Sequence, residues 1–98
     1  IKDYFSKLNA LSKEKDIELK VLILPYEFQT RKNKCSDENL MPQSKIANVL
    51  NSINVSYEDY TKFFCKYKKP KKLFYKFDPM HLSKIGHDLV FSKILEEF

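Results

Sequence analysis

A short, uninterrupted apolar run constrains the fold of this chain more than any other feature. Residues 21–24 read VLIL, and Pro25 follows them directly. A half-exposed strand alternates apolar and polar residues, whereas a continuous apolar strand is typical of a parallel sheet covered on both faces. Proline ends such a strand because it has no N–H group to give to the ladder. Residues 17–24 therefore predict a buried strand that ends at Pro25.

Helices are expected on both sides of this strand. Apolar residues recur at helical spacing in three places: near the start of the chain, after Pro42, and toward the C-terminus. The three stripes comprise Ile1, Tyr4, Phe5, Leu8 and Leu11; then Ile46, Val49, Leu50 and Ile53; then Leu82, Ile85, Leu89, Val90, Ile94 and Phe98, the last set mostly facing inward. Residues 54–60 predict a second strand, and residues 26–39 and 61–76 predict connecting segments.

The order of these elements predicts an α/β fold. Helices that alternate with strands favour parallel strands joined by crossover helices. Two strands alone make a poor parallel sheet, because the buried strand needs neighbours that residues 1–98 do not supply. We therefore expect residues 1–98 to be the C-terminal part of a single, larger α/β domain. No transmembrane segment is expected, since no apolar run approaches the roughly 20 residues that cross a bilayer.

Both histidines of the chain stand in residues 77–87, which read FDPMHLSKIGH. A histidine that acts as a general base needs a partner on one ring nitrogen, which fixes the tautomer and leaves the other nitrogen free. Asp78 can fold back onto His81 in this role. The alternative is an ordinary helix start, with Asp78 as the cap, Pro79 as the first helical residue and His81 on the surface. A metal site that also uses His87 is disfavoured, because six residues of helix separate the histidines onto different faces.

The same stretch holds the only glycine of the chain, Gly86, inside the predicted C-terminal helix. Glycine in a helix costs about 1 kcal/mol relative to alanine. We therefore expect Gly86 to permit close packing of the helix backbone against a neighbouring strand, which would hold the His81 turn in place.

The residues Asp78-Pro-Met-His81-Leu-Ser, followed by Gly86 and an apolar helix, closely resemble the last conserved block of the SGNH (GDSL-type) hydrolases. The resemblance implies a three-layer α/β/α, flavodoxin-like fold. It also implies that His81 is the general base for a serine nucleophile and that Asp78 orients His81. The implied substrates are acyl esters, carbohydrate O-acetyl groups among them, that are hydrolysed or transferred without a cofactor. A second strand that contains Asp59 also fits the later half of that fold, although only the final block is specific.

The chain departs from the family pattern in what it lacks. The family nucleophile lies in a Gly-Asp-Ser motif near the start of the domain, and two middle blocks supply a glycine and an asparagine to the oxyanion hole. None of these blocks occurs in residues 1–98. The nucleophile is therefore expected from an upstream half of the same domain, in the same or a separate chain, and residues 1–98 alone are expected to be inactive. The alternative function is a non-catalytic α/β module that binds an anionic partner.

That alternative depends on a basic segment, Lys66–Lys76. Its six lysines exceed the formal net charge of +5, and no acidic residue stands among them. A solvated loop is the first interpretation of such a segment. An anion-binding patch for an anionic glycan or a membrane surface is the second, and a nucleic-acid contact through lysines and interleaved aromatics is the least favoured. The patch would comprise Lys68, Lys69, Lys71 and Lys72.

Cys35 and Cys65 each follow a predicted strand by a few residues. If the strands are parallel neighbours, both loops leave the same edge of the sheet, and a disulfide is geometrically allowed. Two unrelated thiols are an equal alternative. A disulfide would favour a secreted or extracytoplasmic location. Zinc is not expected, because neither CxxC spacing nor a histidine cluster accompanies the cysteines.

Overall fold

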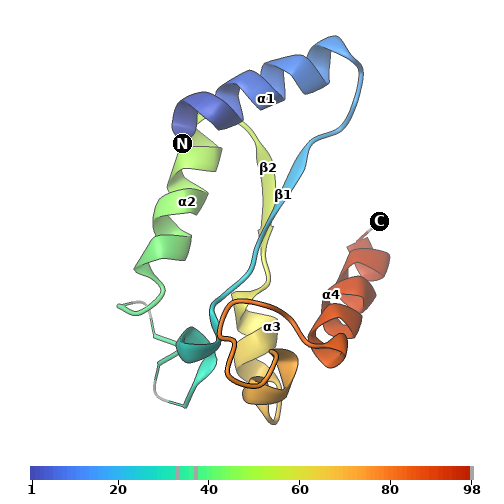
Figure 1. Ribbon diagram of the computed structural model, residues 1–98. Coiled ribbons are helices and arrows are strands. Elements are labelled where there is room, and N and C mark those ends of the chain that lie inside the picture. Colours follow the sequence, from blue (N-terminus) through green and yellow to red (C-terminus); the bar gives the residue numbers. More distant parts are fainter. Residues whose placement is uncertain (33, 37, 98) are drawn as a thin grey trace.

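Two parallel strands form the centre of the protein, β1 (Lys20–Ile23) and β2 (Ser56–Asp59). The computed structural model in Figure 1 describes residues 1–32, 34–36 and 38–97. The strands pair Lys20 with Ser56 and Ile23 with Asp59, and helix α2 (Met41–Ser52) lies in the connection between them. The parallel pairing and the mixed α/β character that the sequence predicts are confirmed.

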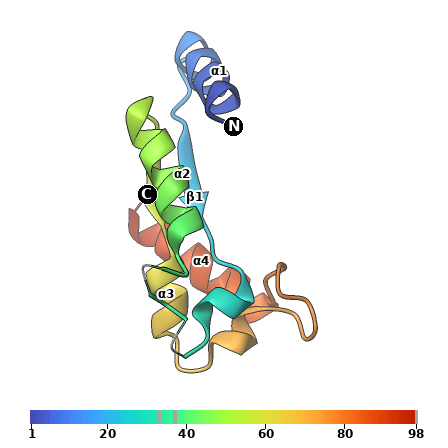
Figure 2. The ribbon, with the colours of Figure 1, turned by 90° about the vertical axis from the view of Figure 1, so that its left-hand side faces the viewer.

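Helices lie on both sides of the two strands. α2 lies on one side, and the C-terminal helix α4 (Lys84–Glu97) lies on the other (Figures 1 and 2). Ile23 packs with buried Leu50 and Val55 on the α2 side, whereas Leu22 packs on the α4 side. The buried cluster on the α4 side comprises Tyr60, Phe64, Leu73 and Phe74, with Leu82, Leu89, Val90 and Ile94 packed against it. This alternation explains residues 21–23 of the apolar run, because both faces of β1 meet apolar side chains. The expected buried strand over residues 17–24 is wrong at both ends, since Ile17 and Leu24 lie outside β1 and are exposed, and Ile23 is the one strand residue that is fully buried.

Both strands are shorter than the sequence predicts. β1 begins at Lys20 rather than at residue 17, and β2 begins at Ser56, just after Asn54 with a left-handed φ of 57°. The segments predicted as connections also contain short helices. These are the 3-10 helix η1 (Glu27–Thr30), α3 (Thr61–Lys66) and the 3-10 helix η2 (Pro70–Leu73). Residues 26–39 and 61–76 are therefore more regular than expected.

The first helix, α1 (Lys2–Glu14), is present as predicted, but most of its apolar stripe is exposed. Phe5 alone of that stripe packs against the cluster around Leu50. Figure 1 shows α1 across one end of the sheet, far from α3 and α4. A hydrogen bond from Asn9 Nδ2 to the Ile53 carbonyl (3.5 Å) links α1 to the end of α2. The stripe lacks a covering layer within the described residues.

The residues predicted to face inward from the C-terminal helix are mostly half-buried, namely Leu82, Leu89, Val90 and Ile94, whereas Phe91 and Leu95 of the same helix are exposed. Ile85 is an exception with 43 % of its surface exposed, because its neighbour Gly86 takes the inward position at that level of the helix. Phe98, also predicted to face inward, lies outside the described residues. Across the described part of the chain, no helix is both long enough and apolar enough to cross a membrane.

A disulfide joins Cys35 to Cys65. Their Cα atoms lie 6.2 Å apart, within the range that disulfides span. The bond ties the segment after η1 to the end of α3. Of the two interpretations of the cysteines, the structure has the disulfide rather than two unrelated thiols, because the parallel strands bring both loops to the same edge of the sheet.

Candidate functional site

The segment between η2 and α4 folds back on itself as a short antiparallel ladder. Phe74 and Leu82 form a β-bridge, and the Tyr75 amide donates to the His81 carbonyl (3.0 Å). The Ser83 amide donates to the carbonyl of Leu73 (2.9 Å). These bonds hold residues 76–80 at the tip of the ladder, which we call the site loop.

The ladder corrects the expected start of the C-terminal helix. α4 begins at Lys84, so Asp78 caps no helix and Pro79 is not a first helical residue. The backbone of residues 81–83 cannot be helical because it is bonded to residues 73–75. Ser83 takes the capping role instead, and its Oγ accepts from the Gly86 amide (3.2 Å). This cap was not predicted from the sequence, although a serine just before an apolar periodic stretch is a known start signal.

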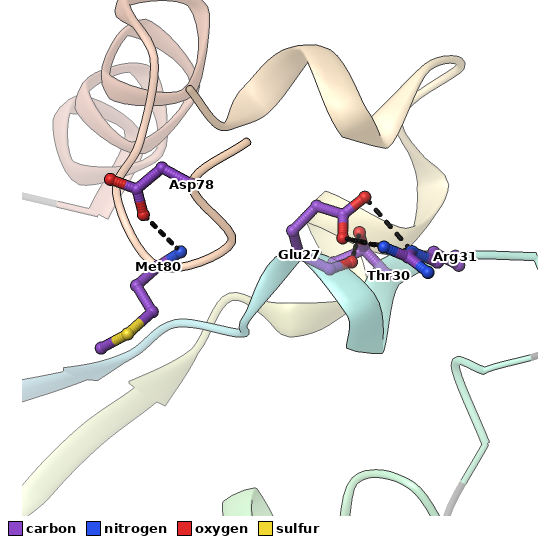
Figure 3. A network of polar contacts seen from close by, with 5 residues as sticks. All are labelled: Glu27, Thr30, Arg31, Asp78 and Met80. Atoms are coloured by element: carbon purple, nitrogen blue, oxygen red, sulfur yellow. Dashed lines mark hydrogen bonds and ion pairs between the residues drawn. The ribbon is translucent and has the colours of Figure 1, made fainter. Parts of the chain in front are cut away.

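Asp78 turns back onto His81, as the general-base interpretation predicts. Its Oδ1 accepts from the amides of Met80 (3.1 Å) and His81 (3.2 Å), and Figure 3 shows the first of these bonds. Its Oδ2 lies 2.8 Å from His81 Nδ1. The bond from the Met80 amide, followed by the bond to the His81 side chain, lowers the pKa of Asp78. An ionised Asp78 places the proton of a neutral His81 on Nδ1 and leaves Nε2 as the acceptor.

His81 is open to approach from outside the chain. Its side chain is 71 % exposed, and within the described residues Nε2 has no hydrogen-bond partner. The other histidine, His87, is exposed on α4. No group of three His, Cys, Asp or Glu side chains in the described ranges is arranged to hold a metal ion. The pair formed by Asp78 of the site loop and His81, directly after it, is therefore the arrangement that can move a proton here.

Gly86 packs closely, as predicted, but its neighbour is not a strand. A Cβ at this position would overlap the carbonyl oxygen of Leu73 at the end of η2, and would lie 3.1 Å from Leu82 Cβ. The same carbonyl accepts the Ser83 amide. Gly86 thus lets α4 approach η2 closely enough to close the base of the site loop.

An ion pair between the buried Glu27 and the exposed Arg31 supports the other side of the site loop. The Glu27 amide donates to the Pro79 carbonyl (2.9 Å), which docks η1 against the loop. The buried Glu27 carboxylate accepts from Arg31 Nη2 (2.9 Å) and Nε (3.1 Å), as Figure 3 shows. This contact raises the pKa of Arg31, chiefly through the side-chain hydrogen bond. Neither Glu27 nor Arg31 was predicted from the sequence, although an acid and a base four positions apart are a recognisable pairing signal.

A groove of about 590 Å³ opens between η1 and the site loop, and Asp78 lies on its wall. Four cationic side chains line it, Arg31, Lys71, Lys72 and Lys76, together with Tyr75 and Phe77. Of the four lysines predicted to bind an anion, the structure places Lys71 and Lys72 on this groove. Lys68 and Lys69 are exposed and are not among its lining residues.

Asp59 has a local structural role. Its Oδ1 accepts from the Thr61 amide (3.0 Å), which stabilises the first turn of α3. This bond places the carboxylate at the end of β2 rather than in the site loop.

No protein-family model, curated protein or solved structure matches this chain. The fold and the site define a small mixed α/β protein with an exposed carboxylate–imidazole pair beside a basic groove.

Proposed function

We propose that residues 1–98 are the acid–base half of a serine ester hydrolase or O-acyltransferase of the SGNH (GDSL) type. The observation that carries this proposal is the 2.8 Å contact between Asp78 Oδ2 and His81 Nδ1, with the rest of the imidazole exposed. In this role His81 Nε2 accepts the serine proton as the serine oxygen attacks the ester carbonyl, and then returns it to the leaving alcohol. Asp78 orients the imidazole and stabilises its protonated form.

The nucleophile and the oxyanion donors come from outside residues 1–98. Ser83 is the serine nearest in sequence to His81, and its hydroxyl is already bonded to the Lys72 carbonyl and the Gly86 amide. The exposed stripe of α1 and the short sheet support a larger, three-layer α/β/α domain of flavodoxin-like type. The disulfide between Cys35 and Cys65 favours an oxidising, extracytoplasmic compartment.

The test is ester turnover by the natural gene product that contains these residues, with p-nitrophenyl acetate as substrate. We expect His81→Ala to lower kcat at least about a hundredfold, the usual contribution of a general base. His87→Ala is the matched control, because it removes the other exposed histidine and leaves the pair intact. Equal turnover in the two variants would refute the catalytic role, as would a natural product without any serine nucleophile.

The geometry of the pair can be tested without turnover. Nitrogen chemical shifts of neutral His81 should report the Nδ1–H tautomer, because the Asp78 carboxylate accepts from Nδ1. The Asp78→Asn variant should abolish that preference, and Asp88→Asn, which changes an exposed carboxylate on α4, should keep it. An Nε2–H tautomer in the parent protein would contradict the proposed orientation.

The basic groove favours a second candidate function, a non-catalytic α/β module that binds an anionic partner through Lys66–Lys76. In that case Asp78 only stabilises its own turn. Ester turnover by the natural product would then be absent or unaffected by His81→Ala, whereas anion binding would persist in that variant.

A further inference from the structure

We infer that the groove beside Asp78 binds an anionic sugar, with its carboxylate or phosphate held by Arg31, Lys71 and Lys72. Under the proposed function, on which this link rests, the sugar is the alcohol part of the ester. The groove adjoins the Asp78–His81 pair: Asp78 and Pro79 of the site loop line its wall, whereas His81 is not among its lining residues.

The charges of the groove are unbalanced in favour of an anion. Its two carboxylates are already engaged, Glu27 by Arg31 and Asp78 by His81. The lysines that line it have no such partner, since within the described residues no carboxylate lies within 4.0 Å of Lys71 or Lys72. Arg31 is held at the mouth of the groove by Glu27, with more than half of its side chain exposed. Glu27 takes the Nε and Nη2 donors of Arg31, so Nη1 is the nitrogen left to a ligand. That donor beside two lysines is suited to a carboxylate or phosphate.

An aromatic side chain stands at the rim in a costly conformation. Phe77 is 94 % exposed and has a φ of 63°, a left-handed value that bulky residues rarely adopt. It occupies the third position of a turn closed by the Asp78 amide and the Tyr75 carbonyl (3.0 Å), where glycine or asparagine is favoured. Lys76 Nζ lies 5.2 Å from the centre of its ring. Such a residue contributes little to packing, so its place at the rim indicates contact with a ligand.

The combination of a flat apolar ring and clustered cations identifies the ligand class. Tyr75 and Phe77 are exposed aromatic side chains on the groove, and the apolar face of a pyranose can pack against such rings beside the cations that hold its charged group. The cations line a concave groove of about 590 Å³, which suits one or two sugar units better than a lipid surface. Engaged carboxylates on the same wall disfavour the continuous phosphate track of a nucleic acid.

The test is calorimetric titration of this chain with tetragalacturonate, glucose 6-phosphate and neutral maltotetraose, and with phosphatidylserine vesicles. We expect at least one anionic sugar to bind, with an affinity that falls as salt rises, and maltotetraose not to bind. Lys71→Gln/Lys72→Gln should weaken binding about tenfold. Lys68→Gln/Lys69→Gln is the matched control with the same charge change, and should bind like the parent. Failure of both anionic sugars, equal weakening by the two pairs, or binding to vesicles alone would overturn the inference.

A substitution at the rim separates binding from folding. Phe77→Asn should leave thermal stability unchanged or raised, because asparagine tolerates a left-handed φ and the phenyl ring has little packing to lose. The same change should weaken sugar binding at least several-fold. A variant that binds as tightly as the parent would show that Phe77 has no role in the groove. A loss of stability would contradict the argument that the exposed ring contributes little to packing.

The two proposals fail in different ways. In the natural product, Lys71→Gln/Lys72→Gln should raise KM for an acetylated galacturonate ester and leave p-nitrophenyl acetate unaffected, whereas His81→Ala should lower kcat for both. If this chain binds the sugar but ester turnover does not depend on His81, the catalytic proposal is refuted and the sugar-binding inference stands. If turnover depends on His81 but is unchanged by substitution of either lysine pair, the sugar-binding inference is refuted and the catalytic proposal stands.

Discussion

Gly86 offers the sharpest test of how the site loop is held. In Gly86→Ala the new Cβ would overlap the Leu73 carbonyl oxygen and lie 3.0 Å from the Leu73 carbonyl carbon. Both are backbone atoms, so the contact can be relieved only by moving α4 away from η2. Overpacking of this kind costs about 1–3 kcal/mol. Weakening the Ser83–Leu73 hydrogen bond costs about 1 kcal/mol more, and the better helix propensity of alanine returns about the same amount.

The expected net loss is therefore about 1–3 kcal/mol of unfolding free energy, or roughly 5–20 °C in Tm for a domain of this size. Thermal and urea unfolding followed by circular dichroism would measure it. Ser92→Ala, on the exposed face of the same helix, gains helix propensity without a clash and should be neutral or slightly stabilising. A Gly86→Ala protein at least as stable as the parent would refute the packing argument, because the overlap would then cost no more than the gain in helix propensity returns.

Three further results are expected. Because the pKa of Asp78 is lowered on folding, the ionised carboxylate stabilises the folded state at neutral pH, and this contribution is lost as the pH falls through the folded pKa. Urea unfolding should therefore show that Asp78→Asn is less stable than the parent at pH 7 and equally stable in strong acid. Reduction of the disulfide, which closes a loop with a sequence separation of 30, should cost about 3–4 kcal/mol, and reductant should not affect Cys35→Ser/Cys65→Ser. Burial, followed by the hydrogen bond to Glu97, raises the pKa of Tyr60 to about 12. The protonated phenol should therefore stabilise the folded state fully below about pH 10, and this contribution should be lost as the pH rises to about 12 and above. Tyr60→Phe should remove the tyrosinate absorbance step near pH 12 and cost about 1 kcal/mol.

The features that the sequence predicts well depend on neighbours along the chain. The apolar run at 21–24 indicates a strand with two covered faces, and its parallel pairing follows from the alternation of elements. The contact between Asp78 and His81 was predictable because three residues of turn bring the two side chains together. The same topology predicted that Cys35 and Cys65 lie at the same edge of the sheet. That prediction allowed a disulfide but did not decide between a disulfide and two unrelated thiols.

The features that the sequence did not reveal depend on distant contacts. The start of α4 is delayed to Lys84 because the carbonyl of Leu73 and the bridge at Phe74 capture the preceding residues. The groove exists because the Glu27 amide reaches the Pro79 carbonyl, some fifty residues further along the chain, and brings Arg31 beside Lys71. Sequence periodicity carries no information about either contact.

The parallel register of β1 and β2 also determines how the chain can begin to fold. Lys20 meets Ser56 only after η1 and α2 have folded back between them, so no local hairpin can nucleate this sheet. The entropy of closing that long loop must be lost before the first ladder bond forms, which slows folding relative to a chain of local contacts. α2 is the longest helix in the segment between β1 and β2, and its early formation shortens the flexible chain that must close before β2 pairs with β1. The rate of folding should therefore respond to helix propensity on the exposed face of α2 more than to the strength of β1 and β2 themselves.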